Sequence, residues 1–273
     1  CQDRLIEEVL KVQPNVVVVL HNGSPVELPW ADKVSAILEM YLGGQGVGEA
    51  CDRLLFGEAN PSGRLAETFP YRLEDNPSFL HFPGNGKRVL YGEDIFVGYR
   101  YYDTKKVPVR YAFGHGLSYT EFTYGDLTLS SAQMTDEDIL TVSLKVKNSG
   151  KTEGKEVVQL YVADLCGISE RPVKELKGFA KVHLLPGEEK TVSMEILARD
   201  LSYYEERLGD WYAPSGTYRI LIGHASDDIR LRADVVFEIK KKLPLRVDFT
   251  TTFGELLDHT KTAPVITELL APL

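Results

Sequence analysis

Residues 139–148 read ILTVSLKVKN, and apolar and polar side chains alternate along this segment. Successive side chains of a β-strand point to opposite faces of its sheet. The segment therefore predicts a strand with one face against a core and the other face in water. The residues assigned to the buried face are Leu140, Val142, Leu144 and Val146.

The same alternation returns downstream, at residues 192–196, 218–222 and 229–239. About seven strands within about 120 residues, without a helical pattern, are typical of an immunoglobulin-like or fibronectin type III-like β-sandwich. We assign this sandwich to residues 122–241. The turns that separate its strands are expected at Asn148-Ser149-Gly150, Pro186-Gly187 and Pro214-Ser215-Gly216.

The first 75 residues mix helical and strand patterns. Apolar spacing predicts helices at residues 2–12 and 47–56. Residues 16–20 read VVVVL, which is typical of a fully buried strand in a parallel sheet, and residues 34–38 form a second short apolar run. We therefore expect a partial open α/β sandwich at residues 1–75, so that the fold class is α/β plus all-β.

Residues 76–121 are rich in Pro, Gly and Tyr and show little periodicity. We interpret them as a long, ordered connecting region without regular structure, and such a region usually has a function. Aromatic residues flank Arg100 in this region. Such clusters more often build a domain interface than bind a sugar. The residues that we consider as substrate contacts at a domain junction are Tyr91, Glu93, Tyr99, Arg100, Tyr101 and Asp103.

Glu93 and Asp94 form an adjacent pair of carboxylates in the same region. Hydrolysis of a glycosidic bond uses two carboxyl groups, one to protonate the leaving oxygen and one as nucleophile or base. Neighbours in sequence rarely face one bond from both sides. We therefore expect Glu93 to be solvated or paired with an arginine.

The last 32 residues, 242–273, form a C-terminal tail. A short strand is expected at residues 245–250 and a helix at residues 253–258. Thr252 can cap this helix, because Glu255 stands three residues later, as in a capping box.

Composition excludes several classes of protein. The formal net charge is −9, and an acidic surface argues against nucleic acid and anionic membranes as partners. No apolar run approaches the roughly 20 residues that span a bilayer. Residue 1 is Cys and not Met, so we expect that the start of the chain is not a native N-terminus, and the missing signal peptide says little about the parent protein. Three cysteines far apart, Cys1, Cys51 and Cys166, favour a reducing, cytoplasmic location.

Familiar catalytic motifs are also missing. The run Gly44-Gln45-Gly46-Val47-Gly48-Glu49 precedes a predicted helix, but Glu49 stands where a dinucleotide fingerprint needs glycine. We interpret it as a tight strand-to-helix turn. The sequence contains no GxSxG elbow, and its six His show no metal-ligand spacing, so no metal or cofactor is expected. His115 is interpreted as a turn or packing residue.

A series of motifs resembles family 3 of the glycoside hydrolases in order and spacing over residues 1–240. The second domain of that family contains segments that resemble four stretches of this chain, which are Val16–Leu20, Gly23-Ser24-Pro25-Val26, Gly44-Gln45-Gly46 and Asn60-Pro61-Ser62-Gly63-Arg64-Leu65. The segments Val97–Asp103 and Phe113-Gly114-His115-Gly116-Leu117 also resemble it. The fibronectin-like domain of the family contains segments that resemble Lys147-Asn148-Ser149-Gly150, Glu156–Val162 and Lys174–Phe179 of this chain.

This resemblance implies a parent enzyme of three parts. An N-terminal TIM-like barrel would carry the catalytic Asp nucleophile, and many members carry the acid/base Glu in the α/β domain, just before the position of Gln2. Both catalytic residues are therefore expected outside this chain, which would be inactive alone. The implied activity is that of a retaining, exo-acting β-glucosidase that needs no cofactor. This chain would complete and brace the active-site cleft.

Several alternatives remain open from the sequence. The parent could have another specificity of the family, such as β-xylosidase or N-acetylglucosaminidase. The chain could be a non-catalytic carbohydrate-binding module, or a natural subunit that assembles with a separate barrel chain. Edge strands of the sandwich could also pair between subunits, so an oligomer is possible.

Overall fold

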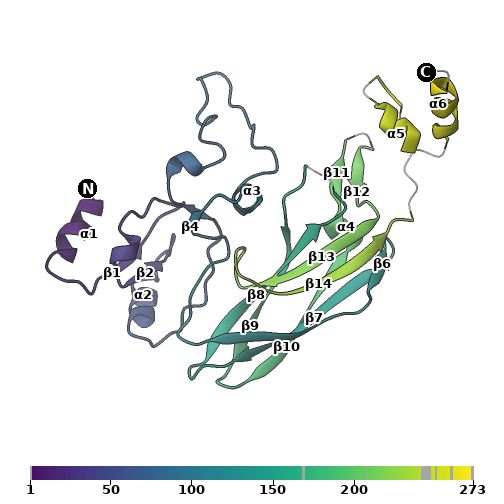
Figure 1. The fold of residues 1–273 in the computed structure, drawn as a ribbon. Coiled ribbons are helices and arrows are strands. Elements are labelled where there is room, and N and C mark those ends of the chain that lie inside the picture. Colours follow the sequence, from purple (N-terminus) through teal and green to yellow (C-terminus); the bar gives the residue numbers. More distant parts are fainter. Residues whose placement is uncertain are drawn as a thin grey trace.

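The computed structural model describes residues 2–167, 170–206, 208–240, 247–249, 251–258 and 261–271. A small α/β part at the N-terminal end lies beside a larger β-sandwich, and a helical tail follows at the far end (Figure 1). The sandwich contains the main hydrophobic core, and the α/β part has a smaller core of its own.

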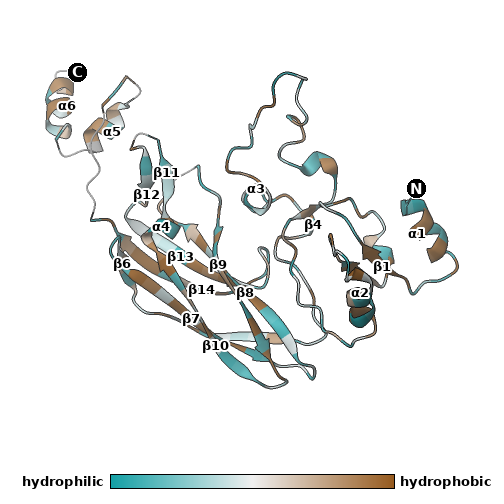
Figure 2. Cartoon of the chain, turned by 180° about the vertical axis from the view of Figure 1, so that it is seen from behind, coloured by the Kyte–Doolittle hydropathy of each residue, from teal (hydrophilic) through white to brown (hydrophobic). Residues whose placement is uncertain are grey.

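Strand β7 (Ile139–Asn148) lies at the centre of one sheet of the sandwich, as the alternating pattern predicts. It pairs antiparallel with β10 (Glu189–Leu197) and with β5 (Phe122–Leu129). Leu140, Val142, Leu144 and Val146 are at most 1% exposed, whereas the residues between them reach solvent. Hydrophobic and hydrophilic residues alternate along the sandwich strands in Figure 2.

The second sheet has five strands in the order β6-β14-β13-β8-β9. All neighbours are antiparallel except β14 and β6, which run parallel. Residues on the inner face of this sheet, such as Val158, Leu160 and Ile220, are fully buried. Each contributes on the order of 1.5–3 kcal/mol to folding. The strand bounds are Gln133–Thr135 (β6), Ile229–Glu238 (β14), Gly216–Gly223 (β13), Gly154–Asp164 (β8) and Glu175–Leu184 (β9). The predicted sandwich is thus confirmed, while the domain boundaries drawn from the sequence stay predictions.

The α/β part begins with helix α1 (Gln2–Leu10) and a parallel pair of strands, β1 (Val17–Leu20) and β2 (Ala36–Glu39). A parallel pair was expected here. The expectation of a fully buried strand is wrong, because Val17 is 49% exposed and no residue of β1 is buried. The segments that the structure describes leave part of this small sheet exposed to solvent, and helix α1 has no buried residue.

Helix α2 (Val47–Leu55) follows the glycine-rich run, which is the predicted strand-to-helix turn. Gly44 has a φ of +67°, a conformation that favours glycine, and the Val47 amide donates to the Gly44 carbonyl. A short 3-10 helix, Ala31–Lys33, separates β1 from β2.

Residues 76–121 contain regular structure that the sequence analysis did not expect. Helix α3 (Tyr99–Lys105) covers the tyrosine cluster, and β4 (Val109–Tyr111) pairs antiparallel with β3 (Phe69–Pro70). Tyrosine is a modest helix former, and seven residues are too few to show a helical period. Tertiary packing therefore stabilises α3, since Tyr102 on it is only 3% exposed. A 3-10 helix, Leu73–Asp75, lies just before this region.

Of the remaining described elements, three lie between β10 and β13, and two helices belong to the tail after the sandwich. Helix α5 (Phe253–Asp258) has the predicted capping box, because the Glu255 amide donates to Thr252 Oγ1 at 3.2 Å and the Thr252 amide donates to Glu255 Oε2 at 2.7 Å. Of the strand predicted at residues 245–250, residues 245, 246 and 250 lie outside the described residues, and the described residues 247–249 do not form a strand. The other elements are α4 (Ala198–Leu201), β11 (Tyr203–Glu205), β12 (Asp210–Tyr212) and α6 (Ala263–Leu270).

Candidate functional site at the junction of the two parts

A cavity of about 850 Å³ lies where the loop after β1, the segment around β3 and helix α3 meet. The described residues of its wall include three carboxylates and three aromatic rings, and none of these described residues is Lys, Arg or His. Carboxylates only accept hydrogen bonds, so the cavity offers acceptors beside apolar faces. These residues are Glu27, Glu67, Glu93, Tyr99, Tyr102 and Phe113.

Glu93 lies in the wall of this cavity and is half-buried. Its Oε2 atom is shielded from solvent and accepts no hydrogen bond from any described residue. This differs from the solvated or arginine-paired role expected from the sequence. Thr68, only 6% exposed, also lines the cavity, and its Oγ1 atom has no partner in the described part of the chain.

Tyr99 connects helix α3 to the sandwich. Its hydroxyl accepts a hydrogen bond from the Leu176 amide of β9 at 2.7 Å. Its ring stacks on Phe113 at 4.8 Å between centroids and meets the edge of Tyr161 at 5.8 Å. The geometry gives Tyr99 the interface role that such clusters usually have.

Two ion pairs fix the same face of α3 to the sandwich. Arg100 Nη2 lies 3.2 Å from Glu175 Oε1, and Lys174 Nζ lies 2.7 Å from Asp103 Oδ2. Glu175 also accepts from Arg171, whose other guanidinium nitrogen contacts Asp164 at 2.9 Å. Burial raises the pKa of Glu175, but Lys177, Arg171 and Arg100 together hold it below its ordinary value.

The other two candidates from the sequence lie apart from these contacts. Tyr101 packs edge-on against Tyr102 with centroids 5.4 Å apart. Tyr91 is 80% exposed, next to an extended loop. The structure therefore brings Tyr99, Arg100 and Asp103 together at the interface with β9, while Tyr91 does not join them.

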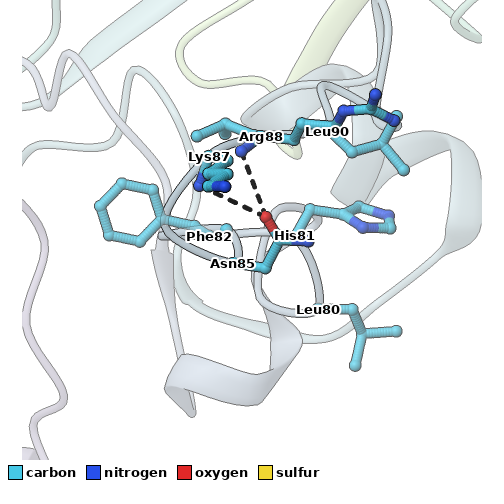
Figure 3. A pocket seen from close by; sticks show the side chains of 9 residues that line it. Leu80, His81, Phe82, Asn85, Lys87, Arg88 and Leu90 are labelled. Carbon is cyan, nitrogen blue, oxygen red and sulfur yellow. Dashed lines mark hydrogen bonds between the residues drawn. The ribbon is translucent and has the colours of Figure 1, made fainter.

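The loop that precedes Tyr91 encloses a second pocket of about 700 Å³ (Figure 3). Asn85 Oδ1 accepts from the backbone amide of Arg88 at 3.2 Å, which closes the loop on itself. Leu80 and Phe82 point outward on different sides of the loop and are 86% and 74% exposed. In Figure 1 this loop projects upward from the α/β part, away from the lower end of the sandwich.

A second set of contacts, centred on Glu156 of β8, joins the two parts of the chain. Arg64 Nη2 donates to Glu156 Oε2 at 2.9 Å, and the Tyr124 hydroxyl donates to Oε1 at 2.9 Å. His224 Nδ1 lies 2.9 Å from the same Oε1 atom. Burial raises the pKa of Glu156, but the hydrogen bond from His224 and the charge of Arg64 outweigh it and leave that pKa below its ordinary value.

The turn Gly114-His115-Gly116 docks against these residues through its carbonyl groups. Gln159 Nε2 donates to the Gly114 carbonyl at 3.2 Å, and His224 Nε2 lies 2.9 Å from the Gly116 carbonyl. A Cβ atom at Gly114 would lie 2.2 Å from Gln159 Oε1. His115 stacks on Tyr111 at 5.1 Å, so it has the packing role that the sequence predicted.

We call the contacts of residues 60–64 and 113–119 with the sandwich the inter-part junction. Asn60 belongs to it, since its Nδ2 donates to the Glu153 carbonyl at 2.8 Å. Sequence analysis quoted Arg64 and Glu156 only inside motifs and did not single out His224. The available signal was that Glu156 is charged but shares one face of the predicted strand with the apolar Val158 and Leu160.

Among the residues that the structure describes, no group of three or more His, Cys, Asp or Glu side chains could hold a metal ion. No helix in the described ranges is long and apolar enough to cross a membrane.

Comparison with known proteins identifies the family of this chain. The profile of the glycosyl hydrolase family 3 C-terminal domain matches residues 1–119, and that of the fibronectin type III-like domain matches residues 156–226. A thermostable beta-glucosidase B from Acetivibrio thermocellus is 51% identical over 269 residues, which are 98% of this chain and 36% of that protein. The chain belongs to the family 3 glycoside hydrolases. It corresponds to the C-terminal part of these relatives.

Solved structures of this family share the fold. The beta-glucosidase from Bifidobacterium adolescentis superimposes with a TM-score of 0.88 at 39% identity, over 96% of this chain and 39% of that one. The Kluyveromyces marxianus beta-glucosidase in complex with glucose gives a TM-score of 0.82 at 43% identity, over 87% of this chain and 28% of that one. The chain thus spans about a third of the length of these family 3 relatives.

Proposed function

We propose that this family 3 chain is the C-terminal part of a retaining, exo-acting β-glucosidase that releases terminal β-D-glucosyl residues. The observation that carries the proposal is the 51% identity to a thermostable beta-glucosidase over 98% of this chain. In this proposal the nucleophile Asp and the acid/base Glu belong to the preceding part of the parent, which includes a TIM-like barrel. The chain supplies a wall of the cleft and a brace.

The distribution of exposed apolar side chains supports a partner on the α/β part. Large hydrophobic residues are exposed on α1, in the loop before α2 and directly after α2, where Leu5, Leu42 and Phe56 reach 65%, 81% and 79% exposure. A parallel sheet normally has both faces covered. A barrel and further strands of the parent would cover this surface.

The contacts of α3 support the bracing role. Arg100, Asp103 and Tyr99 all bind partners on or beside β9, so the sandwich holds the segment that lines the acidic cavity. We propose that this cavity lies at the cleft wall in the parent, where clefts between domains commonly bind ligands.

The test is hydrolysis of an aryl β-glucoside at high concentration by the purified 273-residue chain and by the longer parent. We expect turnover by the parent and none by the chain. Turnover by the chain that survives repurification would overturn the proposal, because both carboxylates would then lie within these residues. Glu93→Gln would be the first variant to examine in that case.

A further inference from the structure

The cavity of about 850 Å³ beside α3, which we call the acidic cavity, has carboxylates without a basic partner among the described residues. Glu27 and Glu67 are exposed and Glu93 is half-buried, and none of the three forms an ion pair with a described residue. Thr68 in the same wall is 6% exposed, and its Oγ1 atom has no described partner. Buried polar groups are normally hydrogen-bonded, so the shielded oxygens Glu93 Oε2 and Thr68 Oγ1 indicate a missing partner.

Further unpartnered oxygens lie beside this cavity, after the carboxyl ends of the parallel strands β1 and β2. Among the described residues these are Asn22 Oδ1, Glu39 Oε2 and the Tyr41 hydroxyl. Tyr41 lies near the Ala66 backbone and Glu67, which both belong to the cavity wall. Burial raises the pKa of Glu39, although the Tyr41 amide donates to its other oxygen, Oε1, at 2.7 Å. The unsatisfied groups thus extend from the cavity to the edge of the small sheet.

Arg72 and His21 come near these carboxylates without pairing with them. Arg72 lies near Glu27, but its guanidinium pairs with Asp75 at 2.6 Å. His21 lies near Glu39 and forms no ion pair with it. The group that neutralises the wall therefore has to come from outside the described residues.

Exposed apolar side chains line the same cavity. Val26, Leu73 and Val97 belong to its wall and are 41%, 60% and 48% exposed. Exposed apolar side chains beside unsatisfied polar groups mark a surface that another part of a protein covers.

The aromatic rings of the wall are already packed against other rings. Tyr99 stacks on Phe113 with centroids 4.8 Å apart and meets the edge of Tyr161. Tyr102 is 3% exposed. A sugar would stack on an open ring face, so this wall favours a charged donor over a saccharide.

We propose that the acidic cavity is the docking site of a Lys or Arg side chain from the part of the parent that precedes this chain. An ammonium or guanidinium group donates several hydrogen bonds and accepts none, which matches a wall of acceptors. The inference rests on the proposed function, in which such a preceding part exists. This chain covers 36% of the thermostable beta-glucosidase B, so most of a parent of that kind lies outside it. The docked side chain fastens the wall of the proposed cleft to the preceding part.

The first experiment compares labelling of carboxylates by carbodiimide and a small amine in the 273-residue chain and in the parent, read by mass spectrometry. Glu27 and Glu67 are exposed in the chain, so docking should lower their labelling several-fold in the parent. Glu137 is the matched control, because it is 72% exposed between β6 and β7 of the sandwich, and it should be labelled equally in both proteins. Unchanged labelling of Glu27 and Glu67 in the parent would overturn the proposal.

Glu93→Gln tests the charge, since glutamine has nearly the same shape as glutamate. In the 273-residue chain Glu93 Oε2 has no described donor, so the variant should keep the melting temperature of the wild type. In the parent the same change removes one partner of a buried ion pair, and the melting temperature should fall by at least about 2 °C. Glu137→Gln, which breaks only an exposed pair with Lys240, should leave both melting temperatures unchanged.

Equal shifts for Glu93→Gln in the chain and in the parent would overturn the proposal, because Glu93 would then act within this chain. A changed KM for an aryl β-glucoside at an unaltered melting temperature of the parent would assign the cavity to the substrate and would also overturn it.

Hydrolysis of the aryl β-glucoside by the wild-type parent tests the proposed function separately. An active parent with equal shifts contradicts the docking site alone. An inactive parent in which only the parent is destabilised contradicts the proposed activity and supports the docking site.

Discussion

Arg64 Nη2 and Glu156 Oε2 lie 2.9 Å apart, with side chains that are 6% and 0% exposed. The two residues come from different parts of the chain, so their ion pair couples the α/β part to the sandwich. Removal of one partner from a buried pair leaves an uncompensated charge and costs about 3–5 kcal/mol. Arg64→Met should therefore lower the free energy of unfolding by an amount of this order, as measured by urea denaturation.

The double variant Arg64→Met, Glu156→Met serves as the control for this prediction. Replacement of both charges by apolar groups is often close to neutral in buried pairs, so part of the lost stability should return. A double variant as unstable as the single one would mean that Arg64 acts through packing and not through its charge.

Gly114 has a φ of +81°, and a Cβ atom there would meet Gln159 Oε1 at 2.2 Å. Gly114→Ala should lower the free energy of unfolding by roughly 2–4 kcal/mol, since backbone strain and overpacking each cost about 1–3 kcal/mol. Calorimetry would measure the change. Gly125→Ala is the matched control, because no atom lies within 4 Å of the position of its Cβ. Equal melting temperatures for both variants would contradict this account.

Prediction from the sequence worked where one local period governs an element. The alternation at residues 139–148 predicted β7 and its buried face, because successive side chains of a strand point to opposite faces and the apolar ones mark the buried face. Helix α3 was missed, because its formation depends on the contacts of Tyr99 and Tyr102 with distant segments. Local sequence carries no record of such contacts.

The junction could not be predicted for the same reason. Arg64 and Glu156 are 92 residues apart, and Glu156 and His224 are 68 apart. Only the fold brings them to one point. The candidates Tyr99, Arg100 and Asp103 were found because they lie within one short aromatic segment, and the structure shows contacts with the sandwich that their order alone does not reveal.

Stability at acid pH should depend on His115. Burial lowers the pKa of this side chain, and the nearby charges of His224 and Arg64 act in the same direction, while Asp227 opposes them. A folded-state pKa below the unfolded value of about 6.5 contributes stability above that pH, and this contribution is lost as the pH falls. The midpoint of urea unfolding should thus drop as the pH is lowered from about 6.5.

His115→Phe tests this origin of the acid sensitivity. Phenylalanine can keep the stacking on Tyr111, whose ring centroid lies 5.1 Å from that of His115, and cannot take up a proton. The variant should lose less stability than the wild type between about pH 6.5 and pH 5. Parallel curves for the two proteins would assign the acid sensitivity to other groups, with Glu156 as the next to examine.

Arg100→Ala in the parent enzyme should lower stability more than it alters specificity. Arg100 Nη2 lies 3.2 Å from Glu175 Oε1, but the arginine side chain is 34% exposed, so the pair contributes only about 0.2–1 kcal/mol. Its loss should reduce the melting temperature slightly, while the ratio of kcat/KM for aryl β-glucoside to that for aryl β-xyloside stays unchanged. Arg53→Ala, which breaks a 3.9 Å surface contact with Glu58, is the control and should leave both quantities unchanged. A large change of the kcat/KM ratio at an unaltered melting temperature would show that Arg100 contacts the substrate instead of serving the interface with β9.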